Sequence, residues 1–175
     1  MFNDRLWDII IIDSDEGKGS SLRPGITIRK GRFHMIQIIA GSKGKGKTPI
    51  LLDKANTEAL ASKGSVVYLD KNSKHMYELN REVRLINIRD YFVDSPETFL
   101  GFVCGMASQD HDLEKVFLDS FLALAGVEGT DIDYAPILDK LEIISAKFHI
   151  DFVISICVDG SQIPERFKDK VIVSL

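Results

Sequence analysis

One octapeptide has the residue types and the spacing needed to hold a polyphosphate. It is Gly41-Ser42-Lys43-Gly44-Lys45-Gly46-Lys47-Thr48, which fits the phosphate-binding pattern G-x-x-x-x-G-K-[ST]. Glycines let the backbone turn with positive φ, and they leave no Cβ to block a phosphate. Such a turn directs successive N–H groups into one anion-binding nest. The pattern predicts that Lys47 reaches the β- and γ-phosphates and that the Thr48 hydroxyl binds Mg²⁺.

The sequence on either side of this loop has the strand–loop–helix order that a phosphate-binding loop requires. Residues 35–40 form a short apolar, β-branched run that indicates a buried strand. Residues 48–63 carry apolar side chains at helical spacing, namely Leu51, Ala55, Ala59 and Leu60. We expect Gly64 to end this helix, and Pro49 fits its first turn. The alternative is a flexible, solvated Gly/Lys loop.

Beyond the loop, strand-like runs alternate with helix-like segments. The predicted strands are residues 65–70, 85–88, 116–119, 152–159 and 171–173. A helix is expected to begin at Ser95-Pro96, with Ser95 as its N-cap, and to use Gly101 and Gly105 for close packing on a sheet. Another is expected over residues 134–148.

The strands are continuously apolar rather than alternating, which indicates burial on both faces. The sequence therefore predicts an α/β three-layer sandwich with a mostly parallel sheet of about five to six strands.

Three of the predicted strands end in aspartate, at Asp70, Asp119 and Asp159. Open α/β sheets bind ligands outside the carboxyl ends of their strands, so each aspartate is a candidate partner for the loop. We favour Asp119, because residues 113–119 have the apolar-then-Asp form of a Walker B strand. Its carboxylate would orient a metal-bound water in the Mg²⁺ shell. The expected catalytic residues are Lys47 and Asp119, and the expected metal ligands are Thr48 and Asp119.

The segments GSKGKGKT, VFLD, FVISICVD and VIVSL resemble the RecA-like (ASCE) division of P-loop NTPases. This resemblance implies the P-loop NTPase fold with RecA-like strand order, in which a later strand separates the Walker B strand from the P-loop strand. Residues 66–119 also look like the core of the thymidine-kinase-like branch. Residues 35–175 more closely resemble small stand-alone bacterial P-loop proteins that often carry a twitching-motility ATPase label. The chain is short for such a motor, so we do not adopt that label.

The sequence departs from the RecA-like pattern where the catalytic glutamate is usually found. Ser120, Phe121 and Leu122 follow Asp119, and Glu114 is expected at the wrong end of its strand. We therefore expect hydrolysis to be weak or partner-stimulated. No [NT]-K-x-D base-reading motif follows the fourth strand, which favours ATP over GTP as the bound nucleotide.

Basic residues follow the second predicted strand, at Lys71, Lys74, His75, Arg81, Arg84 and Arg89. This run could grip an acceptor or a γ-phosphate, and the alternative is a solvated face, with His75 as a surface histidine. Arg166 is a further candidate phosphate contact.

The sequence as a whole leaves three functions open. One is Mg²⁺-dependent ATP binding with weak hydrolysis. Another is phosphate transfer to a small molecule or nucleoside, and the last is nucleotide-dependent regulation without turnover.

The bulk composition disfavours two classes of partner, nucleic acid and membranes. A chain of 175 residues that is 45% hydrophobic and 27% charged is typical of a globular domain. A net charge of −4 does not favour nucleic acid, and no apolar run reaches the length of a membrane span. Cys104 and Cys157 lie in apolar runs, so we expect them to be buried thiols. Two such cysteines without a disulfide framework indicate a reducing cytoplasm. The expected partners are a nucleoside triphosphate and a protein partner or a second copy of the chain.

Residues 1–34 look unlike the rest, because one apolar run, residues 7–12, precedes an acidic, Gly/Ser-rich stretch. This N-terminal extension could be a hairpin that covers a sheet edge, a partner-binding arm, or an artefact of start-site choice with Met35 as the true first residue. We hypothesise that residues 35–175 are the P-loop nucleotide-binding domain and that residues 1–34 are dispensable for it. Loss of folding or of nucleotide binding on their deletion would contradict this.

Overall fold

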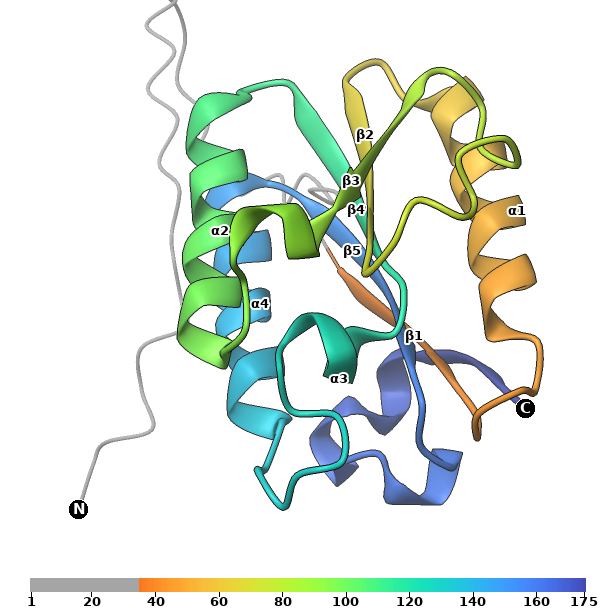
Figure 1. Cartoon of the computed structure of the whole chain (residues 1–175), viewed down its shortest axis with the longest axis vertical. Coiled ribbons are helices and arrows are strands. Elements are labelled where there is room, and N and C mark those ends of the chain that lie inside the picture. The colour runs from red at the N-terminus through yellow and green to blue at the C-terminus, as the bar shows by residue number, and fades with distance from the viewer. Residues whose placement is uncertain (1–34) are drawn as a thin grey trace, which may run out of the picture. The chain divides into compact units, whose positions relative to one another are not determined.

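The computed structural model describes residues 35–175, and the hypotheses about residues 1–34 lie outside them. Within this range the chain forms a six-stranded sheet with helices on both faces (Figure 1). Its strands are β1 (Ile36–Ala40), β2 (Ser65–Asp70), β3 (Val83–Asn87), β4 (Leu113–Leu118), β5 (Asp151–Ile156) and β6 (Val171–Ser174). Its helices are α1 (Lys47–Ala61), α2 (Pro96–Gln109), α3 (Phe121–Leu124) and α4 (Ala135–Phe148), with 3₁₀ turns at Ile88–Tyr91, Gly160–Gln162 and Glu165–Lys170. None of the helices in this range is long and apolar enough to span a membrane.

The strand order is β3-β2-β4-β5-β1-β6, and every neighbouring pair is parallel. β5 lies between β1, which leads into the glycine loop, and β4, which leads into Asp119. The predicted α/β fold with RecA-like strand order is therefore confirmed, and the sheet is wholly parallel within the described residues. Parallel alignment brings the carboxyl ends of β1, β2 and β4 to the same edge, where a ligand site is expected.

Two apolar layers cover the sheet, which explains why its strands read as continuous hydrophobic runs. One layer packs α1 against side chains of β2, β4 and β5, namely Tyr68, Phe117 and Val153. The other packs α2, α3 and α4 onto the opposite face, with Phe99, Phe121 and Leu141 among its buried residues. In Figure 1 α1 lies on one side of the sheet, and α2 and α4 lie together on the other. The glycine loop is thus held between a buried strand and a packed helix.

Two predicted helix features differ from the structure. α1 ends at Ala61, and the Ser62 N–H closes it by donating to the Glu58 carbonyl. Gly64 instead passes close to a neighbouring loop, because a Cβ there would lie 2.0 Å from the Asp112 carbonyl oxygen. The predicted packing role of Gly101 and Gly105 is wrong, since a Cβ at either position would meet open space.

The predicted start of α2 is confirmed by a capping box. The Thr98 N–H donates to Ser95 Oγ at 3.3 Å, and the Ser95 N–H donates to Thr98 Oγ1 at 3.0 Å. These bonds satisfy amides that the first helical turn leaves unpaired.

A charged cluster fixes α1 to the sheet at the end remote from the loop. Glu58 accepts from Lys54 and Lys115 at 2.5 Å each, and Lys115 also lies 3.7 Å from Asp151. Burial tends to raise the pKa of Glu58, but the hydrogen bonds from Lys115 and Lys54 outweigh it, so the pKa is lowered. A lowered folded-state pKa means that the ionised carboxylate stabilises the fold above its ordinary pKa of 4.5, and that this contribution is lost as the pH falls through the folded-state value.

Replacing Glu58 with glutamine should reduce the free energy of unfolding at about pH 7 by on the order of 1 kcal/mol, because Lys115 is mostly buried and loses its closest anionic partner. The difference should largely disappear at a pH well below 4.5, after the pH has fallen through the lowered folded-state pKa and the native carboxyl is protonated too. Urea unfolding of both proteins at the two pH values measures it, with the exposed Glu82→Gln as control. An equal loss of unfolding free energy at both pH values would show that the effect comes from packing and not from charge.

Candidate functional site

The loop after β1 has the backbone conformation that its glycines predict. Gly44 and Gly46 have φ of 84° and 88°, in the left-handed region that favours glycine. Gly41 donates its N–H to the Val158 carbonyl at 2.8 Å, and a Cβ there would lie 3.0 Å from Leu175. Gly46 is the N-cap of α1, so the helix begins at Lys47, immediately after the turn. The unpaired N–H groups of the first helical turn therefore adjoin the loop, as an anion site requires.

Lys47 and Thr48 point in two different directions from the start of α1. Lys47 is only 6% exposed, and its Nζ donates to the Gly41 carbonyl at 2.7 Å and to the Ser42 carbonyl at 2.8 Å. The ammonium group thus lies across the loop. Thr48 Oγ1 donates to the Asp119 carboxylate, at 3.0 Å to Oδ2 and 3.2 Å to Oδ1. The structure thereby brings together the hydroxyl and the carboxylate that the sequence assigned to one metal ion.

Asp119 is held by hydroxyl groups from two neighbouring strands. Its side chain is buried, with 4% of the residue exposed. Ser155 Oγ of β5 donates to Oδ1 at 2.8 Å, and the Tyr68 hydroxyl of β2 donates to Oδ2 at 3.2 Å. Burial, followed by the nearby charge of Asp119, raises the pKa of Tyr68 far above its ordinary value, so Tyr68 stays a neutral donor. Ser120, at φ 59°, donates its N–H to Ser155 Oγ at 2.7 Å.

Sequence reasoning missed Tyr68 and Ser155. The available signal was a hydroxyl within each of two otherwise apolar strands, SVVYLD and DFVISI. Buried hydroxyls need hydrogen-bond partners, and here both find the same carboxylate. These two residues therefore fix the orientation of Asp119.

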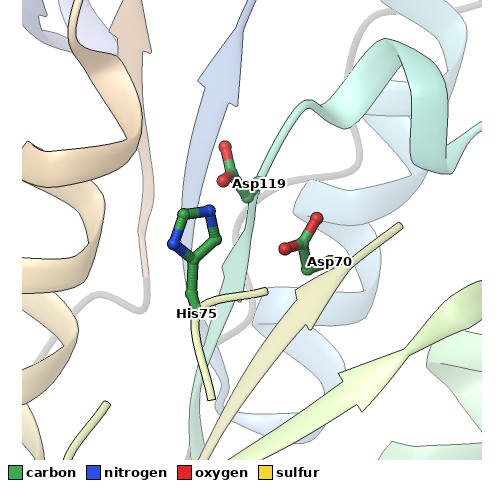
Figure 2. A group of neighbouring side chains, drawn as sticks. All are labelled: Asp70, His75 and Asp119. Carbon is green, nitrogen blue, oxygen red and sulfur yellow. The ribbon is translucent and has the colours of Figure 1, made fainter. Parts of the chain in front are cut away.

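A second buried carboxylate lies beside the first. Asp70 is 3% exposed, and its Oδ1 accepts from the Lys71 N–H at 2.6 Å. Its Oδ2 has no hydrogen-bond partner in the part of the chain that the structure describes. Burial and the charge of Asp119 raise the pKa of Asp70. His75 also faces these carboxylates (Figure 2), so it is not the plain surface histidine that the sequence suggested.

The remaining candidates make local contacts elsewhere. Asp159 accepts from Ser161 Oγ at 2.6 Å and from the Ser161 N–H at 2.9 Å, and these bonds lower the pKa of its exposed carboxyl. Arg166 donates to both oxygens of Asp139 on α4, at 2.8 and 2.5 Å. Glu114 lies at the N-terminal end of β4, where it accepts from the Lys63 N–H at 3.3 Å. It is therefore at the opposite end of β4 from Asp119, as expected.

A cavity of about 190 Å³ lies between the loop and the strand ends. Lys43, Lys47 and Lys71 are among the residues that line it, together with Thr48 and Asp119. The chain beyond β4 and β5 completes it through Ser120, Glu128 and Cys157. The cavity thus combines the predicted phosphate and metal contacts, with an excess of positive side chains on the loop side.

The predicted basic run does not form one surface with this cavity. Lys71 lines the cavity and lies 3.9 Å from Glu128, whereas Arg84 lines a separate, mainly apolar cavity of about 300 Å³ between β3 and α2. The cysteine prediction also needs correction, because Cys104 and Cys157 are free thiols that are only half-buried. Cys157 is partly exposed because it follows the last residue of β5 and borders the cavity.

The sequence matches no protein-family model and no curated protein. Among solved structures, the chain is similar to the crystal structure of the flagellar accessory protein FlaH from Methanocaldococcus jannaschii, with 18% sequence identity and a TM-score of 0.45. The similarity covers 75% of this chain and 63% of the FlaH chain, so this protein spans less than two thirds of the length of that structure. The proposed function therefore rests on the geometry of the site.

Proposed function

We propose that this protein binds a nucleoside triphosphate, most favourably ATP, together with Mg²⁺, and that it belongs to the RecA-like division of P-loop NTPases. One observation carries the proposal. The Thr48 hydroxyl at the start of α1 donates to Asp119 at the end of β4, directly beside a loop that has glycines in the left-handed region. Two segments 71 residues apart thus meet where a phosphate-binding loop needs its metal ligands.

The loop and α1 would bind the phosphates through fixed positive groups. Backbone amides after Gly41 and at the helix start would donate to phosphate oxygens. Lys47 would exchange its two carbonyl partners for the β- and γ-phosphates, which are stronger, charged acceptors. Lys43 and Lys71 add positive potential from the cavity wall.

The donor set at the end of β4 fits Mg²⁺. Thr48 Oγ1 and the Asp119 carboxylate are adjacent oxygen ligands, the type that this hard cation prefers. Thr48 would coordinate the ion, and Asp119 would orient one of its waters. When bound, Mg²⁺ would neutralise part of the phosphate charge. Tyr68 and Ser155 would keep Asp119 in place during this exchange.

Hydrolysis is expected to be slow or dependent on a partner. Phe121 and Leu124, which follow Asp119, are fully buried, so this segment offers no carboxylate to a water molecule. Glu128 does line the cavity, but it lies against Lys71. The buried, apolar segment after Asp119 also favours a second candidate function, nucleotide-dependent regulation without turnover.

Thermal unfolding with ATP, GTP and ADP, each with and without Mg²⁺, tests the proposal. We expect the largest increase in Tm with ATP and Mg²⁺ together, because the metal ligands and the loop then act on one ligand. Phosphate release from the same samples separates slow hydrolysis from binding without turnover. The absence of any shift with a triphosphate would overturn the proposed function.

A further inference from the structure

We propose that Asp70, His75 and Asp119 form a second cation site, which takes a transition-metal dication such as Zn²⁺ or Mn²⁺ in the absence of nucleotide. The site goes beyond the proposed Mg²⁺–nucleotide function, although it shares Asp119 with it. One ligand atom from each residue lies within 4.8 Å of the others. Figure 2 shows the imidazole next to the Asp119 carboxylate, with the Asp70 carboxylate to one side of them.

The spacing of these atoms is close to that of a metal centre. Metal–ligand bonds of 2.0–2.2 Å at tetrahedral angles place the ligand atoms roughly 3.3–3.6 Å apart, so a pair at the 4.8 Å limit must approach by roughly 1–1.5 Å. Adjacent strands fix the two carboxylates, because the Asp119 N–H donates to the Leu69 carbonyl at 3.0 Å. His75 belongs to a turn segment after β2 and not to a strand, so a shift of this residue would leave the strand pairing intact.

The unpaired oxygen of Asp70 is the independent sign of a missing ligand. Oδ2 is fully buried and lacks a partner within residues 35–175. In the same range, neither Asp70 nor Asp119 forms an ion pair with lysine or arginine, although both are at least 96% buried. Lys47 uses its ammonium group on the Gly41 and Ser42 carbonyls. Buried charges are normally paired or bound to metal, and a dication would satisfy both carboxylates together.

The contacts of His75 indicate the class of metal. Its Nδ1 lies 2.7 Å from Glu78 Oε1, and in the tautomer whose Nδ1–H donates to that carboxylate, Nε2 would offer its lone pair to a metal. Figure 2 shows the nitrogen farther from the main chain turned toward Asp119. This is the carboxylate–histidine–metal arrangement that orients imidazole ligands. Imidazole with carboxylates suits Zn²⁺, Mn²⁺ or Fe²⁺, whereas Mg²⁺ and Ca²⁺ favour all-oxygen ligand sets.

Metal titration of the nucleotide-free protein tests the inference. The full chain is stripped with a chelator, and calorimetry with Zn²⁺, Mn²⁺ and Mg²⁺ is combined with metal analysis after dialysis. We expect one Zn²⁺ or Mn²⁺ per chain at this site, with much weaker Mg²⁺ binding. His75→Ala should weaken the binding of Zn²⁺ by at least about 10-fold, because it removes a metal ligand. Glu78→Gln should weaken it by about 10-fold, because Glu78 orients the imidazole by accepting from Nδ1, the ring nitrogen that does not bind the metal.

His111→Ala is the matched control, because this exposed histidine lies in a different cavity, near Gly64. It should leave the binding of Zn²⁺ unchanged, and circular dichroism checks the fold of each variant. Equal Zn²⁺ affinity in the His75→Ala and wild-type proteins would overturn the inference, as would equal affinity of the wild type for Mg²⁺ and Zn²⁺. Because no nucleotide is present, this result is separate from the triphosphate binding assay, and either proposal can fail alone.

Discussion

Replacing Lys47 with alanine is expected to abolish the stabilisation that Mg²⁺–ATP gives the wild-type protein. Lys47 is the buried cation of the loop, and its ammonium group lies within hydrogen-bonding distance of the loop carbonyls of Gly41 and Ser42. A ligand at about 100 times its Kd stabilises a protein by about 2.7 kcal/mol, which raises Tm by about 5–10 °C for a chain of this size. The Tm of Lys47→Ala should be almost independent of nucleotide.

Lys45→Ala is the matched control, because it removes the same charge from the same loop. The Lys45 side chain is exposed and is not part of the cavity lining, while its backbone N–H remains. Its nucleotide-induced shift should stay close to that of the wild type. Comparing each variant with and without nucleotide removes any change in intrinsic stability, since Lys47→Ala also leaves two carbonyls without a donor. Equal loss in both variants would indicate general electrostatic attraction instead of a specific phosphate contact.

The loop and its flanking elements could be predicted from the sequence because their signals are local. Glycines at fixed spacing predict the turn, and the helix follows from the periodicity of α1. Asp119 could be selected because it directly follows a buried apolar run. The position of β5 between β1 and β4 came from the family resemblance, since nothing in the pattern of separate strands specifies which strands pair.

The environment of Asp119 could not be predicted, because it depends on which strands are neighbours. Tyr68 and Ser155 are 51 and 36 residues away from Asp119, and they reach it only through the order β2-β4-β5. The grouping of Asp70 and His75 with Asp119 has the same origin, since it needs both the β2–β4 ladder and the path of the turn after β2. The role of Gly101 was misjudged because helical spacing does not reveal which face of α2 meets the sheet.

Replacing Asp119 with alanine is expected to destabilise the protein strongly even without ligand. Three hydroxyls, from Thr48, Tyr68 and Ser155, would lose a common acceptor, and Tyr68 and Ser155 are fully buried. Each buried donor left without an acceptor costs about 1–3 kcal/mol, so a loss on the order of 3 kcal/mol in the free energy of unfolding is expected. Urea unfolding measures it, and a loss below about 1 kcal/mol would contradict a structural role for these bonds.

Asp119→Asn separates the structural role of this residue from its role toward the metal. The amide has the same shape and keeps an oxygen that can accept from Ser155, so this variant should be much more stable than Asp119→Ala. It removes the negative charge that orients a water in the Mg²⁺ shell. We therefore expect Asp119→Asn to bind ATP with little or no gain from added Mg²⁺, whereas the wild type gains clearly. Calorimetric titration with ATP, with and without Mg²⁺, measures both affinities. A full Mg²⁺ effect in Asp119→Asn would show that this carboxylate does not serve the nucleotide-bound metal, even if the loop binds phosphate.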